Sequence, residues 1–455
     1  MTVTPFKTKT SVAGLVERWR SSAARYPASA TIEISDRCNE VCVHCYQIQG
    51  QKGEMTTADI ERVLDELAEL GVLFLTLSGG EATLRDDFLD IVRHARERRF
   101  AVKLFTNGLT MTRELAHELA LLAVQEVQIS LYSHRAEMHD WVTRVPGSWQ
   151  RAVDGARHLV AERVAVVLKT PLMSINVDGY REYIELATSI GADYILDPTL
   201  DPREDGDRGP EAFRIDDETF VNVMRDPLLV GQIDRAPRSQ RSLTKSVCGA
   251  CSGSVHVEAN GEIQPCSMLD VDCGHALRDG VAAAWEQNET AQSIRALTWG
   301  DLHGCRDCDL RAYCGRCFAM SRAEGGDALG PYASACHRAR LMYRVETGKE
   351  PTILPSSDVS RDAAVGPYRE RSDGAFEPIA DVVTHNDHAF ARRHGWVRRE
   401  ASPPPPTTRA TPGGLVQIRR PGRKRDAIER VPPPALDSRV ASDQTQPSDR
   451  PSAGA

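Results

Sequence analysis

Residues 31–46 read TIEISDRCNEVCVHCY, in which a short run with strand character, TIEIS, leads directly into a loop with three cysteines. Cys38, Cys42 and Cys45 are followed by no other cysteine until Cys248. Thiolates are soft ligands that suit iron–sulfur clusters or zinc, and a short loop can place three of them at three corners of a four-iron cube. The fourth iron then lacks a protein ligand, so the loop predicts a metal site with one open position for a substrate or cofactor.

Strand and helix signals alternate outward from this stretch. Thr56 and Asp59 resemble a capping box, apolar residues then follow helical spacing, and Gly71 predicts the end of that helix. The further signals predict helices near 86–98, 112–123, 148–162 and 178–190, and strands at 72–78, 101–106, 127–132, 164–170 and 192–197. Six strands alternating with helices predict an α/β fold with a parallel sheet and right-handed crossovers.

Polar loops follow the first four predicted strands. The cysteine loop follows the first, Gly79-Gly80-Glu81 the second, Thr106-Asn107-Gly108 the third, and residues 130–133 the fourth. Ligands bind where the carboxyl ends of parallel strands gather, so the four loops predict one site.

Charge and composition exclude several classes of protein. The 455 residues carry a net charge of −8, and in residues 355–455 basic residues outnumber acidic ones, 16 to 13, so the acidic excess lies in residues 1–354. An acidic body argues against nucleic-acid binding. The most apolar run, VLFLTL at 72–77, is too short for a membrane span, and the start has no apolar stretch of signal-peptide length. We therefore expect a cytoplasmic protein, in which clustered cysteines are metal ligands or catalytic groups rather than disulfides.

The composition also predicts a domain organisation. The alternation ends near residue 200, the remaining nine cysteines lie in residues 248–336, and 14 of the 26 prolines lie from residue 355 onward. We expect an N-terminal extension (1–30), the catalytic α/β domain (31–200), a linker (201–247), a metal-organised domain (248–345) and a disordered Pro-rich tail (346–455). The tail's basic patch, from Arg419 to Arg425, could meet an acidic partner, although a solvated tail explains it more simply.

The CxxxCxxC spacing, together with Ser78-Gly79-Gly80-Glu81 after the second strand, resembles the radical S-adenosylmethionine (SAM) superfamily over residues 31 to about 200. The resemblance implies a partial (βα)6 TIM-like barrel. It also implies a [4Fe-4S] cluster whose open iron chelates SAM and whose electron cleaves SAM, giving a 5′-deoxyadenosyl radical that takes hydrogen from a substrate.

The same resemblance assigns residues to SAM. Gly79, Gly80 and Glu81 should hold its amino group, which suits a carboxylate facing an ammonium. Thr106, Asn107 and Ser130 would face its carboxylate and ribose, with plain strand-end capping as the alternative. Arg144 could bind the carboxylate, although relatives often place arginine one position earlier.

Two positions depart from the family pattern. His44 stands where many relatives have an aromatic residue, and Ala82 stands where they have proline. Neither change removes a ligand. We interpret His44 as a neighbour of the cofactor rather than a fourth ligand.

The later cysteines resemble the SPASM extension of radical enzymes, which holds two auxiliary four-iron clusters. Carried over by position, one cluster takes Cys248, Cys251, Cys266 and Cys317, and the other takes Cys305, Cys308, Cys314 and Cys336. The last pair is spaced CxxC, one residue shorter than is usual in the family. Cys273 is left over as a buried thiol. Zinc is the competing interpretation of the CxxC pairs.

The resemblance implies an enzyme that modifies a ribosomally made peptide, for example by an oxidative crosslink, with the auxiliary clusters as an electron relay. The alternative within the superfamily is a maturase of a sulfatase, or an enzyme of tetrapyrrole or cofactor biosynthesis. The alternative of another class is a non-catalytic iron–sulfur or zinc protein.

The expected partners are the peptide, an electron donor of flavodoxin or ferredoxin type and, because residues 1–30 are short for a leader-binding module, a separate leader-peptide-binding protein. Lys169, at a strand end, could contact substrate or solvate the edge of the sheet. No residue is predicted to deprotonate a substrate radical.

Overall fold

The computed structural model describes residues 26–204, 207–230, 240–351, 368–370 and 376–378. Its main feature is one eight-stranded sheet in the order β6-β5-β4-β3-β2-β1-β7-β8. The first six strands are parallel and in chain order: β1 (Ser29–Ser35), β2 (Phe74–Gly79), β3 (Ala101–Thr106), β4 (Glu126–Ser130), β5 (Val166–Pro171) and β6 (Asp193–Asp197). The α/β fold with a partial barrel is therefore confirmed, and each strand end lies within three residues of its prediction.

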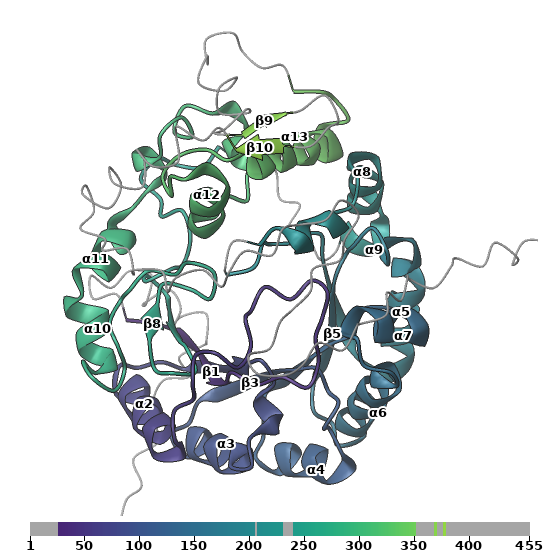
Figure 1. Cartoon of the computed structure of the whole chain (residues 1–455), viewed down its shortest axis with the longest axis vertical. Coiled ribbons are helices and arrows are strands. Elements are labelled where there is room, and N and C mark those ends of the chain that lie inside the picture. The colour runs from purple at the N-terminus through teal and green to yellow at the C-terminus, as the bar shows by residue number, and fades with distance from the viewer. Residues whose placement is uncertain (1–25, 205–206, 231–239, 352–367, 371–375, 379–455) are drawn as a thin grey trace, which may run out of the picture.

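Helices cover one side of this sheet. They are α2 (Thr57–Glu69), α3 (Phe88–Glu97), α4 (Arg113–Leu121), α6 (Ser148–Ala161) and α7 (Tyr180–Ile190). The short helix α5 (Ala136–Thr143) belongs to a separate apolar cluster, against which Cys42 packs. Figure 1 shows α2, α3, α4 and α6 following one another along the outer side of the strands. The predicted capping box of Thr56 and Asp59 is confirmed at the start of α2.

The core lies between these helices and one face of the strands. Along β1, Ala30, Ile32 and Ile34 are at most 1% exposed and belong to the same apolar cluster as Ile60 and Leu64 of α2. Alternate residues of a strand point to opposite faces, so the residues between them face the inside of the partial barrel. The inner face is the polar one, and the loops at its carboxyl edge form the site.

The cysteine-rich region joins the same sheet. β7 (Ser254–Val257) pairs with β1 in parallel, and β8 (Ile263–Gln264) pairs with β7 as a hairpin. Beyond them follow α10 (Val281–Gln287), α11 (Glu289–Ala296), α12 (Phe318–Gly325) and α13 (Ala333–Thr347). The sequence did not predict that strands from this region would extend the sheet.

The segment predicted as a linker has structure of its own. It holds a 3₁₀ turn, η3 (Gly209–Phe213), and two helices, α8 (Asp217–Arg225) and α9 (Pro227–Val230). Phe220, Val221 and Met224 of α8 pack against Leu341 and Met342 of α13, so this segment also connects the two predicted domains.

The predicted extension 1–30 and tail 346–455 lie mostly outside the described residues, apart from residues 26–30 and 346–351 and a short hairpin of β9 (Tyr368–Glu370) and β10 (Phe376–Pro378). Within the part of the chain that the structure describes, no helix is both long and apolar enough to cross a membrane.

Candidate active site

The three-cysteine loop lies at the carboxyl end of β1 and is attached to α5. The backbone N–H groups of Val41 and Val43 donate to the carbonyl oxygens of Thr143 and Val142, both at 3.0 Å. Cys42 packs against an apolar cluster that includes Trp141 of α5. These contacts hold the loop over the edge of the sheet, where the other predicted loops meet.

The three thiols lie close to one another in poorly solvated surroundings. The pKa of Cys38 is raised to about 12, chiefly by burial, with smaller contributions from the Glu81 and Glu40 carboxyls and the Cys45 thiol. Burial, Glu40 and Cys45 likewise raise the pKa of Cys42 well above its usual value. Thiols of this kind ionise only when a cation compensates the charge, so this donor set fits metal ligands better than free nucleophiles.

Two glycines let β2 approach the start of this loop closely. A Cβ on Gly79, whose φ is +131°, would lie 2.1 Å from the Ser35 carbonyl oxygen, and one on Gly80 would lie 2.5 Å from that of Arg37. In return, the N–H groups of Gly80 and Glu81 donate to these two oxygens at 2.9 and 2.7 Å. Only glycine fits this joint, which sets the height of the cysteine loop relative to β2.

Glu81 is 1% exposed, and its carboxylate accepts hydrogen bonds from neighbouring residues of the chain. Oε1 accepts from Thr106 Oγ1 at 2.8 Å and from the Thr83 N–H at 3.1 Å, and Oε2 accepts from the Asn107 N–H at 2.7 Å. Burial raises its pKa, and these hydrogen bonds oppose the rise. The geometry therefore gives Glu81 and Thr106 a part in joining the β2 and β3 loops, while a direct contact of either with SAM stays a prediction.

Asn107 lies between the cysteine loop and the end of β3. Its Nδ2 donates to Asn39 Oδ1 at 2.6 Å and lies 3.9 Å from Cys38 Sγ. Ser130, at the end of β4, is half-buried and is the register partner of Lys169 on β5. Lys169 Nζ lies 3.4 Å from the centre of the Phe105 ring, and burial lowers its pKa to about 8. Asn107 thus lies beside the three-cysteine loop, and Ser130 and Lys169 lie on the inner face of the sheet.

Arg144 is the residue that ends α5, directly after Thr143, whose carbonyl holds the cysteine loop. Its backbone is left-handed, with φ of 62°, and its guanidinium lies 4.4 Å from the centre of the Trp141 ring. Burial lowers its pKa. The structure brings Arg144 near the loop but shows it stacked on an aromatic ring, so its role toward a carboxylate stays a prediction.

The sequence did not single out two residues that contact the cysteine loop. Glu40 is 2% exposed, and its Oε2 lies 3.3 Å from Cys42 Sγ. The Tyr132 hydroxyl lies 3.7 Å from the same sulfur, and the Tyr132 ring packs edge-on against His44 at 4.6 Å. Glu40 is visible in the sequence only as one more acidic residue, and Tyr132 only as the end of a strand.

The later cysteines lie in two groups. In the first, the pKa of Cys266 is raised to about 11, chiefly by burial, and the thiols of Cys317 and Cys248 contribute to this rise. Cys248 in turn interacts with Cys317 and Cys251. These are the four residues that the resemblance assigned to one auxiliary cluster.

The second group gathers around Cys336 of α13. Burial raises its pKa to about 12, and the thiols of Cys314, Cys305 and Cys308 add to the rise. The leftover thiol, Cys273, is 1% exposed and forms a hydrogen bond with Cys251, which together with burial raises the pKa of Cys273 strongly.

Among the residues that the structure describes, no three His, Cys, Asp or Glu side chains converge closely enough to hold one metal ion. In a four-iron cluster each cysteine binds a different iron, so the ligands stand further apart than around one zinc ion.

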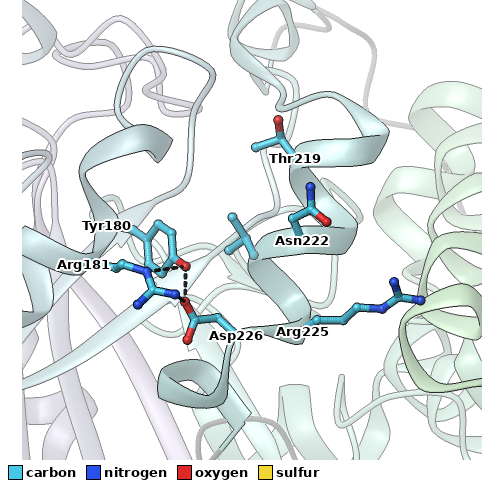
Figure 2. A pocket seen from close by; sticks show the side chains of 7 residues that line it. Tyr180, Arg181, Thr219, Asn222, Arg225 and Asp226 are labelled. Atoms are coloured by element: carbon cyan, nitrogen blue, oxygen red, sulfur yellow. Dashed lines mark hydrogen bonds and ion pairs between the residues drawn. The ribbon is translucent and has the colours of Figure 1, made fainter. Parts of the chain in front are cut away.

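A surface pocket of the described chain lies away from this site. It has a volume of about 340 Å³ and lies between α7 and α8, and none of the predicted site residues lines it. Figure 2 shows that Asp226 accepts from Tyr180 and Arg181 there, so the charged groups of this pocket already have partners.

Comparison with known families matches two parts of the chain. Residues 32–187 match the radical SAM superfamily, and residues 248–309 match the iron–sulfur cluster-binding domain known as SPASM. Among solved structures, native anSMEcpe with bound AdoMet has a TM-score of 0.55 at 16% identity, covering 70% of this chain and 96% of its own. At this identity the likeness supports the fold alone.

Three curated relatives show the range of activities in the family. Mycofactocin maturase MftC of Mycolicibacterium smegmatis is 35% identical over 75% of this chain and 90% of its own length. PqqA peptide cyclase of Rhodopseudomonas palustris is 26% identical over 73% and 92%. AdoMet-dependent heme synthase of Methanosarcina barkeri is 27% identical over 65% and 93%.

The cofactors follow from these matches. The radical SAM domain binds a [4Fe-4S] cluster and S-adenosylmethionine, and the SPASM domain binds iron–sulfur clusters. The gathered, desolvated thiols on the sheet edge suit such clusters. This chain therefore belongs to the radical SAM superfamily and is an enzyme of its SPASM-containing branch.

Proposed function

We propose that this enzyme modifies a ribosomally made peptide, forming a crosslink or a related oxidative change. The observation that carries the proposal is the combination of one three-thiol loop with two four-thiol groups around a shared sheet. The first set leaves a position open for SAM, whereas the other two have no open corner. Clusters without an open position suit electron transfer, which an oxidative crosslink needs because the substrate radical must lose an electron.

The chain's own residues would divide the work as follows. Cys38, Cys42 and Cys45 bind the first cluster, and the glycine joint at Gly79 and Gly80 fixes their height above the sheet. When bound, the cluster would supply one electron to SAM, whose C5′–S bond would break to give methionine and a 5′-deoxyadenosyl radical able to abstract hydrogen from the substrate.

The SAM contacts and the domain limits belong to the same proposal. We assign Glu81, Thr106, Asn107, Ser130 and Arg144 to SAM, and we keep the predicted limits 31–200 and 248–345, which contain the two family matches. We infer a cytoplasmic location from the twelve free cysteines, which suit a reducing compartment.

Two relatives support a peptide substrate. One is named a PqqA peptide cyclase and the other a mycofactocin maturase, and the chain covers about nine tenths of the length of each. The tetrapyrrole alternative has one specific observation in its favour, since an AdoMet-dependent heme synthase is matched over 93% of its length.

The test is anaerobic co-expression with a short peptide encoded beside the gene, followed by mass spectrometry of the peptide. We expect a loss of two hydrogens that disappears in the Cys42→Ala variant. An unchanged peptide mass without deuterium uptake, combined with conversion of a tetrapyrrole precursor by the purified enzyme, would replace the peptide proposal with the heme alternative.

The proposal includes a separate leader-peptide-binding protein and an electron donor of flavodoxin or ferredoxin type. Calorimetry with the leader peptide tests the first: we expect binding to the purified chain to be weak alone and to tighten when the partner is added. Tight binding to the chain alone would contradict it. For the second, reduced flavodoxin or ferredoxin should replace a chemical reductant in SAM cleavage.

A further inference from the structure

Arg316 is a buried cation between the two later cysteine groups. It lies in the stretch Cys314-Gly315-Arg316-Cys317 and is 6% exposed. Cys314 belongs to one group and Cys317 to the other, so the chain itself places the guanidinium where the groups meet.

Neutral oxygens satisfy only one side of this guanidinium. Nη2 donates to Ser321 Oγ at 3.0 Å and to the carbonyl oxygens of Ala328 and Gly330, both at 2.6 Å. Nε and Nη1 are buried without a hydrogen-bond partner, and in the described part of the chain no carboxylate forms an ion pair with Arg316. The Asp327 carboxylate, which is nearby in sequence, accepts from the Leu329 N–H instead.

The groups near Arg316 are thiols from both sets and the ring of Phe318, whose centre lies 5.4 Å from the guanidinium carbon. The guanidinium is close enough for its charge to act on Cys305 and Cys248, one from each set, and it reaches Cys314 and Cys317 as well. None of its nitrogens forms a regular hydrogen bond with a cysteine sulfur.

A buried cation needs an anionic counterpart, because an uncompensated charge in a poorly solvated interior is costly. Four thiolates around an oxidised four-iron cluster leave a net negative charge of roughly two units, and reduction adds one more. A neighbouring guanidinium therefore stabilises the reduced form more than the oxidised form.

We propose that Arg316 is the counter-cation shared by the two auxiliary clusters and that it raises the reduction potentials of both. This inference rests on the proposed assignment of cysteines to two clusters. Because their reduction potentials are raised, both clusters can accept an electron from the substrate.

The test is EPR-monitored potentiometry of the full-length, anaerobically reconstituted enzyme with Arg316→Gln. We expect both auxiliary midpoint potentials to fall, with iron and sulfide content unchanged. Arg340→Gln is the matched control: the Arg340 charge lowers the pKa of Cys308 and Cys336, so only that cluster's potential should fall. Potentials that do not move in Arg316→Gln, or a shift in only one of them, would overturn the proposal.

Arg316→Lys covers the case in which the glutamine variant fails to assemble its clusters. It keeps the charge, so both clusters should form with potentials close to the wild type, and a fall in one potential alone would contradict a shared cation. If the wild-type enzyme shows no iron beyond one four-iron cluster, the cluster assignment fails instead, which separates the two ideas.

Discussion

At the scale of single residues, Glu33 shows how this inner face handles buried charge. It lies on β1, is 6% exposed, accepts from Gln47 Nε2 at 2.8 Å and lies 3.7 Å from His256 Nε2. Burial raises its pKa from 4.5 to about 7, with the Lys52 charge opposing and the Glu258 and Glu204 charges adding. Because the folded-state pKa is the higher one, stability is lost as the pH rises through this range.

The variant Glu33→Gln should therefore become more stable relative to the wild type as the pH rises from 5 to 8. The gain should approach about 3 kcal/mol above pH 7, because the ionisation penalty is absent from the amide. Anaerobic thermal unfolding at several pH values measures it. Burial lowers the pKa of His256 to about 4, so this neighbour of Glu33 is neutral in both folded proteins between pH 5 and 8. A gain that shrinks with rising pH would contradict this account.

The candidate metal ligands could be predicted from the sequence, because their signal is local spacing. The triplet at Cys38, Cys42 and Cys45 gathers in space as its spacing indicates. Glu40, Tyr132 and Arg316 could not be predicted from the sequence, because each gains its role from a contact that only the tertiary structure makes. Likewise, the local sequence does not show that the Glu81 carboxylate accepts hydrogen bonds from Thr106 and Asn107 at the end of β3.

At the scale of elements, the joint between β2 and the cysteine loop is the feature most sensitive to substitution. In Gly80→Ala the new Cβ would lie 2.5 Å from the Arg37 carbonyl oxygen, so loop and strand must separate. We expect a loss of roughly 1–3 kcal/mol of stability, as for overpacked sites, and reduced iron binding by the three-cysteine loop.

Gly253→Ala is the matched control for this joint, because a Cβ there meets no atom within 4 Å. Its melting temperature and iron content should match the wild type. If the two alanine variants behave alike, the close approach at Gly80 is not what holds the loop.

The element pattern also shows where sequence reasoning stops. Up to residue 197, the six strands and the helices other than α5 were predicted because hydrophobic periodicity and caps are local signals, whereas α5 was missed. β7 was missed because SVHV is short and pairs with β1, which is more than two hundred residues earlier in the chain. α8 and α9 were missed because the preceding loop, DPREDGDRGP, suggested a continuous linker.

At the scale of the whole molecule, the three cysteine groups lie in one chain that is built around the same sheet. We expect that substitutions in one group affect only the function of that group. Cys305→Ala combined with Cys308→Ala should lower the iron content from about twelve to about eight atoms per chain. SAM cleavage should persist, because the three-cysteine loop is untouched, while peptide modification is lost. Iron and sulfide analysis, with Cys273→Ala as the control that keeps all clusters, measures this. A loss of about eight irons would mean that the two groups form one unit.

The most direct test of the central claim is the release of 5′-deoxyadenosine from SAM by the reduced, anaerobically reconstituted enzyme, compared between wild type, Cys42→Ala and Cys273→Ala. The account predicts release by the wild type and by Cys273→Ala, and none by Cys42→Ala, because Cys42, unlike Cys273, belongs to the three-cysteine set that leaves one iron open. Release that persists in Cys42→Ala, or none from a wild-type enzyme with full iron content, would contradict it.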